Sequence, residues 1–433
     1  MKISHGEIII SPAVGTRVAG YGTDDVSVAK LDDLYLSALA LDDGKKKIVI
    51  LGFDLLGIQD AWIVRFRESV AAVFGGEPSD CILTCTHTHT GPNTRILMDA
   101  PEIFEEAYLE ELEKSTVELV RELFAKPFVD TDVFFYSANC DENLNRRYVG
   151  PENRCSFLPH RREVEKIADG ICDKEIGGLF FVNRATRQPE YVIGNFAAHP
   201  LAGHAPGLGG LRISADFPGA FRDYIKSEMG IESMYISGAC GDTVPRGHET
   251  GSEAIRKVGV NLACAAIDAM ILAQRNPDNF KLTNESLQSC IETRTYKVRE
   301  HKLDALKPET AGQTEIDLDV QLVSIGDVCL IGVPGEMVSE LGLEMKWHSP
   351  FRKTFILYCS TSYISYICHG NALVAGGYEA GAQIPDSRTG LKLVNAAIDG
   401  AYTLYERTFP DPTAWLVNNP PVLVAHKVLE PKK

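Results

Sequence analysis

Two histidines separated by one residue are the first sign of metal chemistry in the sequence. His87 and His89 lie in a threonine-rich stretch, residues 84–92, that follows the apolar residues 81–83 and ends in Gly-Pro. Such an apolar run is typical of the end of a buried strand, along which side chains alternate between two faces. Both histidines would then project to the same side and supply half of a metal site. The alternative is a pair of polar histidines in a turn.

Further side chains that could bind a metal follow predicted strands. His199 stands before a proline after one apolar run, with His204 in the glycine-rich loop behind it. Glu336 closes a Pro-Gly-Glu sequence after another run, and the tyrosine pair of residues 363 and 366 lies beyond a third. Histidine nitrogens with one carboxylate form a common catalytic zinc set, which leaves a position open for water or substrate. A His-Pro after a strand is more often structural and a Pro-Gly-Glu is more often a turn. The prediction therefore rests on their shared position at strand ends.

Other polar residues at strand ends have their own interpretations. Asp54 ends a buried strand and is either part of the active edge of a sheet or the N-cap of a helix. Arg146, beside another arginine, is either surface charge or a clamp for an anion or a carbonyl group. Asp216 is placed to cap a helix that begins near Pro218. Residues 238–245 form a loop of small residues that would let the backbone approach a ligand closely.

The elements that must position these residues are strands and amphipathic helices. Apolar runs predict buried strands, and helical periodicity predicts helices at 60–75, 102–125, 251–274 and 388–406. The fold class that follows is α/β, with mixed β-sheets covered by helices and the metal site in loops at strand ends. We expect one elaborate catalytic domain over residues 1–410, with a rim excursion drawn from 275–315 and a C-terminal tail at 411–433.

Composition limits the classes of function. The 433 residues carry a net charge of −16, which disfavours nucleic acid as a partner because little basic surface remains to neutralise phosphates. No apolar run reaches membrane-spanning length, so membrane insertion is not expected. The eleven cysteines form no obvious framework, which favours a reducing compartment. We expect a cytoplasmic protein without a visible signal peptide; a secretory protein trimmed of its signal would look the same.

A series of motifs resembles the neutral/alkaline ceramidases. Residues 86–92, Thr-His-Thr-His-Thr-Gly-Pro, are similar to the T-H-T-H-S-G-P motif of that family. Further matches follow in the same order over residues 5–405: 143–146 (N-x-N-R), 173–175 (D-K-x), 195–200 (W-F-A-x-H-P), 214–216 (S-x-D), 333–336 (V-P-G-E), and Tyr366 with Tyr378-Glu379 (a Tyr and Tyr-Glu pair).

The resemblance implies hydrolysis of the amide of N-acyl sphingosines at a zinc ion. Its zinc ligands would be His87, His199, Glu336 and Tyr366, and His89 would lie beside the metal near the substrate. Two further residues, Arg146 and Tyr378, would contact or polarise the substrate carbonyl.

The sequence departs from the family at two places. The G-D-x-S-P loop of the family reads Gly-Asp-Thr-Val-Pro here, so Val244 stands in place of the serine and Thr243 is one residue away. We expect Thr243 to face elsewhere and Val244 to form an apolar wall of the pocket. The second departure is at the C-terminus, where the sequence has no room after residue 410 for the C-terminal β-sandwich domain of the family.

Together these observations predict a zinc-dependent hydrolase of an amide (N-acyl) or related bond in a small-molecule substrate. The zinc would lower the pKa of its bound water towards about 7, which makes a protein nucleophile unnecessary. The base would be His89, Asp216 or Asp242. The alternatives are a hydrolase of an ester or a sugar-linked amide, and a catalytically silent binding protein that retains the metal site.

Overall fold

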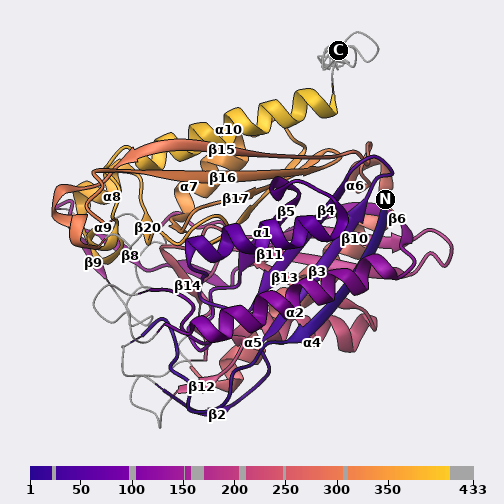
Figure 1. Ribbon diagram of the computed structural model, residues 1–433, viewed down its shortest axis with the longest axis horizontal. Coiled ribbons are helices and arrows are strands. Elements are labelled where there is room, and N and C mark those ends of the chain that lie inside the picture. Colours follow the sequence, from indigo (N-terminus) through magenta and orange to yellow (C-terminus); the bar gives the residue numbers. More distant parts are fainter. Residues whose placement is uncertain are drawn as a thin grey trace, which may run out of the picture.

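Two β-sheets pack against each other at the centre of the protein (Figure 1). The computed structural model describes residues 1–21, 26–96, 104–150, 152–157, 170–203, 211–246, 250–305 and 311–409. The first sheet has eight strands in the order β13 (Glu232–Ser237), β11 (Pro189–Phe196), β10 (Glu175–Asn183), β6 (Val129–Asn139), β1 (Lys2–Ile9), β3 (Tyr35–Asp42), β4 (Lys47–Phe53) and β5 (Cys81–Cys85). The second has four, in the order β15 (Leu287–Lys297), β16 (Glu315–Ile325), β17 (Val328–Gly332) and β19 (Lys353–Leu357).

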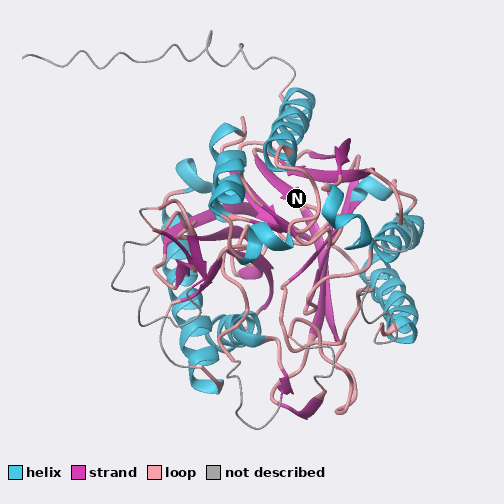
Figure 2. Cartoon of the chain, turned by 90° about the vertical axis from the view of Figure 1, so that its left-hand side faces the viewer, coloured by secondary structure: helices cyan, strands magenta, loops and turns pink. Residues whose placement is uncertain are grey.

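Helices cover the outer faces of both sheets (Figure 1 and Figure 2). On the first sheet, α1 (Asp60–Phe74) and α2 (Glu106–Ala125) cover β3, β4 and β5, while α4 (Asp216–Met229) and α5 (Ser252–Arg275) cover β6, β10, β11 and β13. On the second, α7 (Ser339–His348) and α10 (Thr389–Thr408) cover β16, β17 and β19. The remaining elements are the helices η1 (Pro78–Asp80), α6 (Pro277–Phe280), η3 (Glu300–Ala305), α8 (Gly370–Ala375) and α9 (Tyr378–Ala382), and the two-stranded pairs β2 (Ser27–Lys30) with β12 (Leu211–Ile213), β7 (Asn143–Asn145) with β14 (Thr243–Pro245), β8 (Arg147–Val149) with β9 (Cys155–Phe157), and β18 (Glu336–Met337) with β20 (Tyr366–Ile367).

Strand β4 shows why the central runs of the sequence are continuously apolar. Its side chains alternate between the two faces of the sheet, so Ile48 and Ile50 pack towards the second sheet while Val49 and Leu51 pack under α1 and α2. Because both faces are covered, neither set can be polar. This arrangement confirms the predicted α/β fold of mixed sheets covered by helices.

Within the two large sheets, three pairs of strands run parallel, and their ends meet at one place. The pairs are β4 with β5, β11 with β13, and β17 with β19; the other strand pairs of the two large sheets are antiparallel. The Ser237 hydroxyl donates to the Thr86 carbonyl at 2.7 Å, and the Tyr358 amide donates to the Ser237 carbonyl at 3.0 Å. These bonds join the carboxyl ends of β5, β13 and β19, and so gather the loops that carry the candidate site residues.

The predicted helices lie where the periodicity placed them, within four residues at each end. Residues 275–315, predicted as a polar excursion, contain β15, an eleven-residue strand that pairs along its whole length with β16. Its polar residues face outward at the edge of the second sheet, which explains the weak apolar signal.

The division into one domain and a tail stays a prediction, and residues 411–433 lie outside the described residues. Among the described helices, none is long and apolar enough to span a membrane.

Asp54 is not the N-cap of a helix, because Gln59 precedes α1; it directly follows β4 at the edge that carries the candidate site. Its buried carboxylate accepts hydrogen bonds from both terminal nitrogens of Arg222, from the Tyr35 amide at 2.8 Å and from the Thr86 hydroxyl at 3.2 Å. Arg222 lies on α4, so this buried ion pair ties the end of β4 to a helix distant in sequence. Removal of one partner would leave the other charge buried and unpaired.

We therefore expect Arg222→Ala to lower the free energy of unfolding by about 3 kcal/mol or more, measured by urea titration. The matched control is Arg121→Ala, because Arg121 pairs with Glu118 on the exposed face of α2, with both side chains more than 60% exposed. That variant should change stability by about 0.5 kcal/mol or less. Equal losses in the two variants would contradict the assigned role of the Arg222 pair.

Candidate metal centre

His87 lies two residues beyond β5, in a loop rather than in the strand. Its φ of 70° is in the left-handed region, which histidine visits more often than most residues. The predicted strand alternation is therefore the wrong reason for pairing it with His89, although the two ring centroids do lie 5.0 Å apart. His87 Nδ1 donates to the Leu56 carbonyl oxygen at 2.7 Å, and Nε2 is buried without a hydrogen-bond partner.

His199 follows β11 by three residues and is held in a similar way. Its Nδ1 lies 2.7 Å from the Cys240 carbonyl oxygen and 3.2 Å from that of Thr243. With the proton on Nδ1, the lone pair of Nε2 points towards Glu336, whose Oε2 is 3.2 Å away. Burial and the positive charge of Arg146 lower the pKa of His199 to about 4, which keeps the imidazole neutral.

Glu336 reaches the histidines from β18, the short strand that follows β17 of the second sheet. Its Oε2 lies 3.5 Å from His87 Nε2, and hydroxyl groups of two tyrosines, Tyr358 and Tyr363, donate to its two oxygens. Burial raises the pKa of Glu336, but the facing imidazoles of His87 and His199 outweigh burial and hold the pKa well below its usual range. The carboxylate is therefore ionised and fixed between the two rings.

Tyr366 is placed beside Glu336 by a two-residue parallel pair, β18 with β20, in which these two residues are direct partners. Its buried hydroxyl accepts a hydrogen bond from Arg146 at 3.0 Å. Burial and the negative charge of Glu336 raise the pKa of Tyr366 well above its usual value. Tyr366 thus lies on the Glu336 side of the candidate centre, and Glu336 itself contacts His87 and His199.

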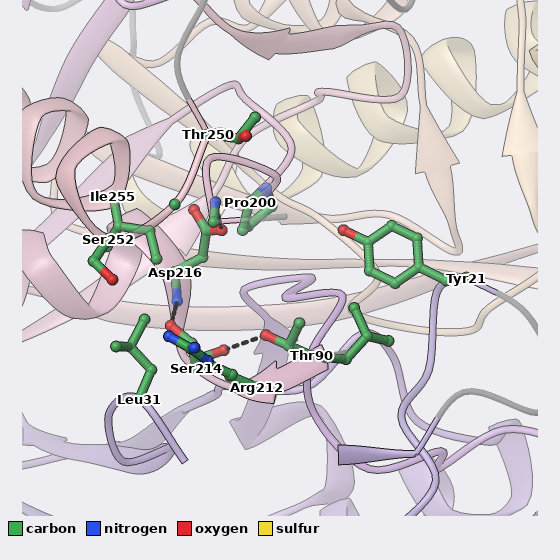
Figure 3. A pocket seen from close by; sticks show the side chains of 13 residues that line it. Tyr21, Leu31, Thr90, Pro200, Arg212, Ser214, Asp216, Thr250, Ser252 and Ile255 are labelled. Atoms are coloured by element: carbon green, nitrogen blue, oxygen red, sulfur yellow. Dashed lines mark hydrogen bonds between the residues drawn. The ribbon is translucent and has the colours of Figure 1, made fainter. Parts of the chain in front are cut away.

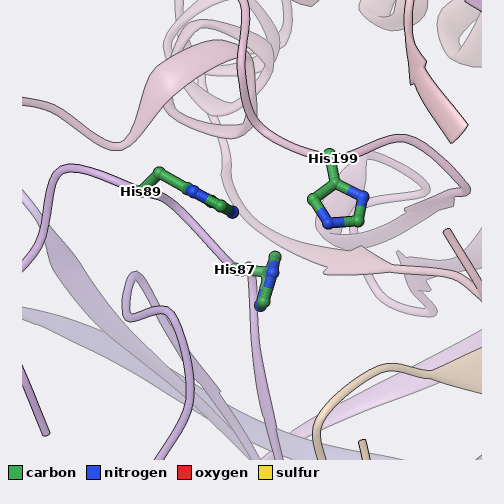
Figure 4. A group of neighbouring side chains, drawn as sticks. All are labelled: His87, His89 and His199. Carbon is green, nitrogen blue, oxygen red and sulfur yellow. The ribbon is translucent and has the colours of Figure 1, made fainter. Parts of the chain in front are cut away.

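His89 completes a group of three imidazoles (Figure 4). One ligand atom from each of His87, His89 and His199 lies within 4.8 Å of the others. His89 Nδ1 donates to the Gly20 carbonyl oxygen at 3.0 Å, and Nε2 is buried without a partner. Gly20 has a φ of 103°, and a Cβ there would lie 2.4 Å from the His89 ring, so only glycine permits this contact. Burial lowers the pKa of His89 well below its usual value.

The residues present fit a bound cation. Two buried imidazole Nε2 atoms have no hydrogen-bond partner, which is costly unless a ligand satisfies them. Each Nδ1 is committed to a backbone carbonyl, the usual arrangement that directs the other nitrogen to a metal. A buried, ionised carboxylate adjoins the same nitrogens and supplies negative charge. The cluster is therefore a candidate metal centre.

Arg146 and Tyr378 lie on the Tyr366 side of the centre. Arg146 is buried and donates to Tyr366, to the Gly241 carbonyl oxygen at 2.9 Å and to Glu379 Oε1 at 2.7 Å. Tyr378 is 56% exposed, and its ring centroid is 5.4 Å from that of Tyr366. Arg146 is therefore held by hydrogen bonds inside the protein, whereas the ring of Tyr378 is partly exposed to solvent.

The two candidate aspartates have carboxylates that are already occupied. Asp216 accepts from the backbone amides of Ala202, Gly203 and Phe217, and so fastens the loop after His199 as well as beginning α4.

Asp242 accepts from the amide and hydroxyl of Ser339 and from the Asn145 side chain at 2.7 Å. Burial raises its pKa. The loop of small residues, 238–245, approaches protein rather than ligand here, because a Cβ on Gly241 would lie 2.7 Å from the Glu336 carbonyl oxygen.

Thr243 and Val244 form part of β14, which pairs with β7. The Thr243 side chain is fully buried and its hydroxyl donates to the Ala197 carbonyl oxygen at 3.0 Å. Val244 packs on Leu144, its direct partner across the pair, and on Leu201. The Thr243 hydroxyl is thus engaged in the frame, and Val244 belongs to a small apolar cluster.

Sequence reasoning gave no role to three residues that support the centre. Tyr358 and Tyr363 hold the Glu336 carboxylate, and Glu379 bridges Arg146 and Arg147 with two bonds of 2.7 Å. The strand-end rule that selected His87 would also have selected Tyr358, which directly follows β19. Glu379 is fully buried. No pattern in the sequence around Glu379 indicates that it pairs with two arginines more than 230 residues earlier in the chain.

Comparison with known proteins adds the fold relationship. No family model and no curated protein sequence matches the chain. Neutral ceramidase from Pseudomonas aeruginosa matches its structure with a TM-score of 0.77 and 17% identity, over 94% of this chain and 74% of that one. A ceramidase complexed with C2 matches with a TM-score of 0.76 and 17% identity, over 94% and 75%. The chain therefore has the α/β fold of the neutral ceramidases, as the motif series predicted.

Proposed function

We propose that the chain is a zinc-dependent hydrolase that cleaves an amide (N-acyl) or related bond. The observation that carries the proposal is the convergence of three imidazole Nε2 atoms and the ionised Glu336, with every Nδ1 committed to a backbone carbonyl. The shared fold with neutral ceramidases supports hydrolysis of a carbon–nitrogen bond as the reaction class.

In this proposal His87, His199, Glu336 and Tyr366 hold the metal. Nitrogen and carboxylate donors in this number suit zinc. When bound, zinc would polarise a substrate carbonyl and lower the pKa of a coordinated water. The negative charge of Glu336 would offset part of the charge of the ion.

In this proposal, other residues of the site bind the substrate and transfer a proton. His89 is the favoured base, because its Nε2 is bare while the carboxylates of Asp216 and Asp242 are taken up by backbone and side-chain donors. Arg146 and Tyr378 would donate to the substrate carbonyl from the Tyr366 side. The cytoplasmic location stays a prediction.

The first prediction concerns zinc content. Protein purified without chelator should contain about one zinc per chain by elemental analysis. His87→Ala and His199→Ala should each lose most of this zinc, because each variant lacks one metal ligand. His348→Ala is the control, since His348 is exposed at the end of α7 and should leave zinc content unchanged. Full zinc occupancy in a His87→Ala/His199→Ala double variant would rule out the assigned site.

The second prediction concerns Tyr378. Tyr378→Phe should lower kcat about a hundredfold if the hydroxyl donates to the substrate in the transition state. Zinc content and melting temperature should stay the same, because the side chain is more than half exposed. Arg146→Ala is a poorer test, since it also leaves Glu379 with only one of its two arginines. A Tyr378→Phe variant with unchanged kcat would remove Tyr378 from the chemistry.

The third prediction concerns the nucleophile. Thr243→Val removes the hydroxyl and keeps the shape, so it should retain most activity while losing about 1 kcal/mol of stability with the bond to Ala197. Intact-mass spectrometry during turnover should find no acyl group on the protein. An acyl adduct on Thr243, or an inactive variant that is folded and loaded with zinc, would show instead that Thr243 is the nucleophile.

A further inference from the structure

A small pocket opens beside the three histidines. It has a volume of about 280 Å³ and adjoins the centre through Thr90, which follows His89, and Pro200, which follows His199 (Figure 3). The Tyr21 ring, on its wall, has its centroid 5.2 Å from that of His89. The full lining is Tyr21, Leu31, Thr90, Pro200, Gly203, Leu211, Arg212, Ser214, Asp216, Thr250, Gly251, Ser252 and Ile255. Two lining residues, Thr90 and Pro200, are therefore the direct chain neighbours of His89 and His199.

The size of the pocket limits that arm. At about 30 Å³ for each water-sized group, 280 Å³ holds roughly nine such groups. A long alkyl chain would leave most of its length outside, so the pocket selects a compact group.

The lining is unusually polar for a ligand pocket. Seven of its thirteen residues have polar or charged side chains, whereas ligand pockets are mostly apolar with few polar groups. Several of these polar groups already have partners within the protein. The Thr90 hydroxyl donates to the Ser214 carbonyl, the Ser214 hydroxyl donates to Asp32, and Asp216 accepts three backbone amides.

Three donors on the lining are left for a ligand. In the described part of the chain, the residues Arg212, Thr250 and Ser252 are exposed, and their side chains make no hydrogen bond or ion pair. They lie on different sides of the pocket (Figure 3). Arg212 is the one cation among the described lining residues, and a guanidinium binds a carboxylate through paired hydrogen bonds.

We propose that this pocket binds a compact, carboxylate-bearing arm of the substrate, with Arg212 as its charge partner and the hydroxyls of Thr250 and Ser252 as further donors. This inference rests on the proposed hydrolase function and specifies its substrate class. The reaction then releases a carboxylate-bearing acid or amine rather than a long-chain lipid.

Four amides and two measurements test the proposal. N-acetylglycine carries a carboxylate on its amine arm and N-propylsuccinamic acid carries one on its acyl arm; N-acetylglycinamide and N-propylsuccinamide are their neutral partners of equal size. Zinc-loaded protein should favour at least one acid over its neutral partner by about tenfold, in KM for hydrolysis and in Kd by calorimetry. Arg212→Met should abolish this preference. Ser252→Trp, which fills the pocket from an exposed position, should weaken binding of both members of the pair.

The matched control is Arg256→Met, which removes an exposed arginine of α5 outside the pocket and should keep the preference. Absence of any preference in the wild type, or its survival in Arg212→Met, overturns the pocket assignment. Hydrolysis without an Arg212-dependent preference leaves the hydrolase function intact and rejects the substrate class. An Arg212-dependent preference in calorimetry without hydrolysis of any amide supports the pocket and rejects the hydrolase function.

Discussion

The candidate centre depends on hydrogen bonds from histidine Nδ1 atoms to backbone carbonyls. His87, His89 and His199 each donate to a carbonyl from a different loop, at 2.7 to 3.0 Å. The Leu56 and Cys240 carbonyls follow β4 and β13, whereas Gly20 lies in the loop before β2, and each carbonyl fixes the orientation of the ring that donates to it. One ligand atom from each ring then lies within 4.8 Å of the others, so the three imidazoles surround one candidate metal position.

The charged side chains around the three histidines are paired with one another, which stabilises the arrangement of the site. Glu336 is ionised and buried, and two tyrosine hydroxyls share its two oxygens. Arg146 brings a positive charge to the same side, and the fully buried Glu379 neutralises it. His87 adds backbone strain through its positive φ, a conformation that costs about 1–3 kcal/mol and persists only where its surroundings hold it. The Ser237 bond to Thr86 supplies such a constraint immediately before His87.

Local patterns predicted the elements and most of the centre, because both depend on short-range signals. Strand ends are visible as apolar runs that stop, so His87, His199 and Glu336 could be selected without knowing how the strands pair. The roles of Asp54 and Glu379 could not be predicted, since their arginine partners lie 168 and more than 230 residues away. Strand β15 was also missed, because an edge strand with an exposed face carries a weak apolar pattern.

Val244 shows that the departure from the ceramidase motif extends beyond one side chain. It faces Leu144 directly across the β7–β14 pair and contacts Leu201, so its surroundings are apolar. A hydroxyl at this position would sit in that cluster without an evident partner, which costs free energy when it is buried. The residues around position 244, Leu144 and Leu201, are therefore suited to an apolar side chain such as valine. Because the hydroxyl of Thr243 is committed to the Ala197 carbonyl oxygen, this loop supplies no free hydroxyl, which agrees with the proposal that water is the nucleophile.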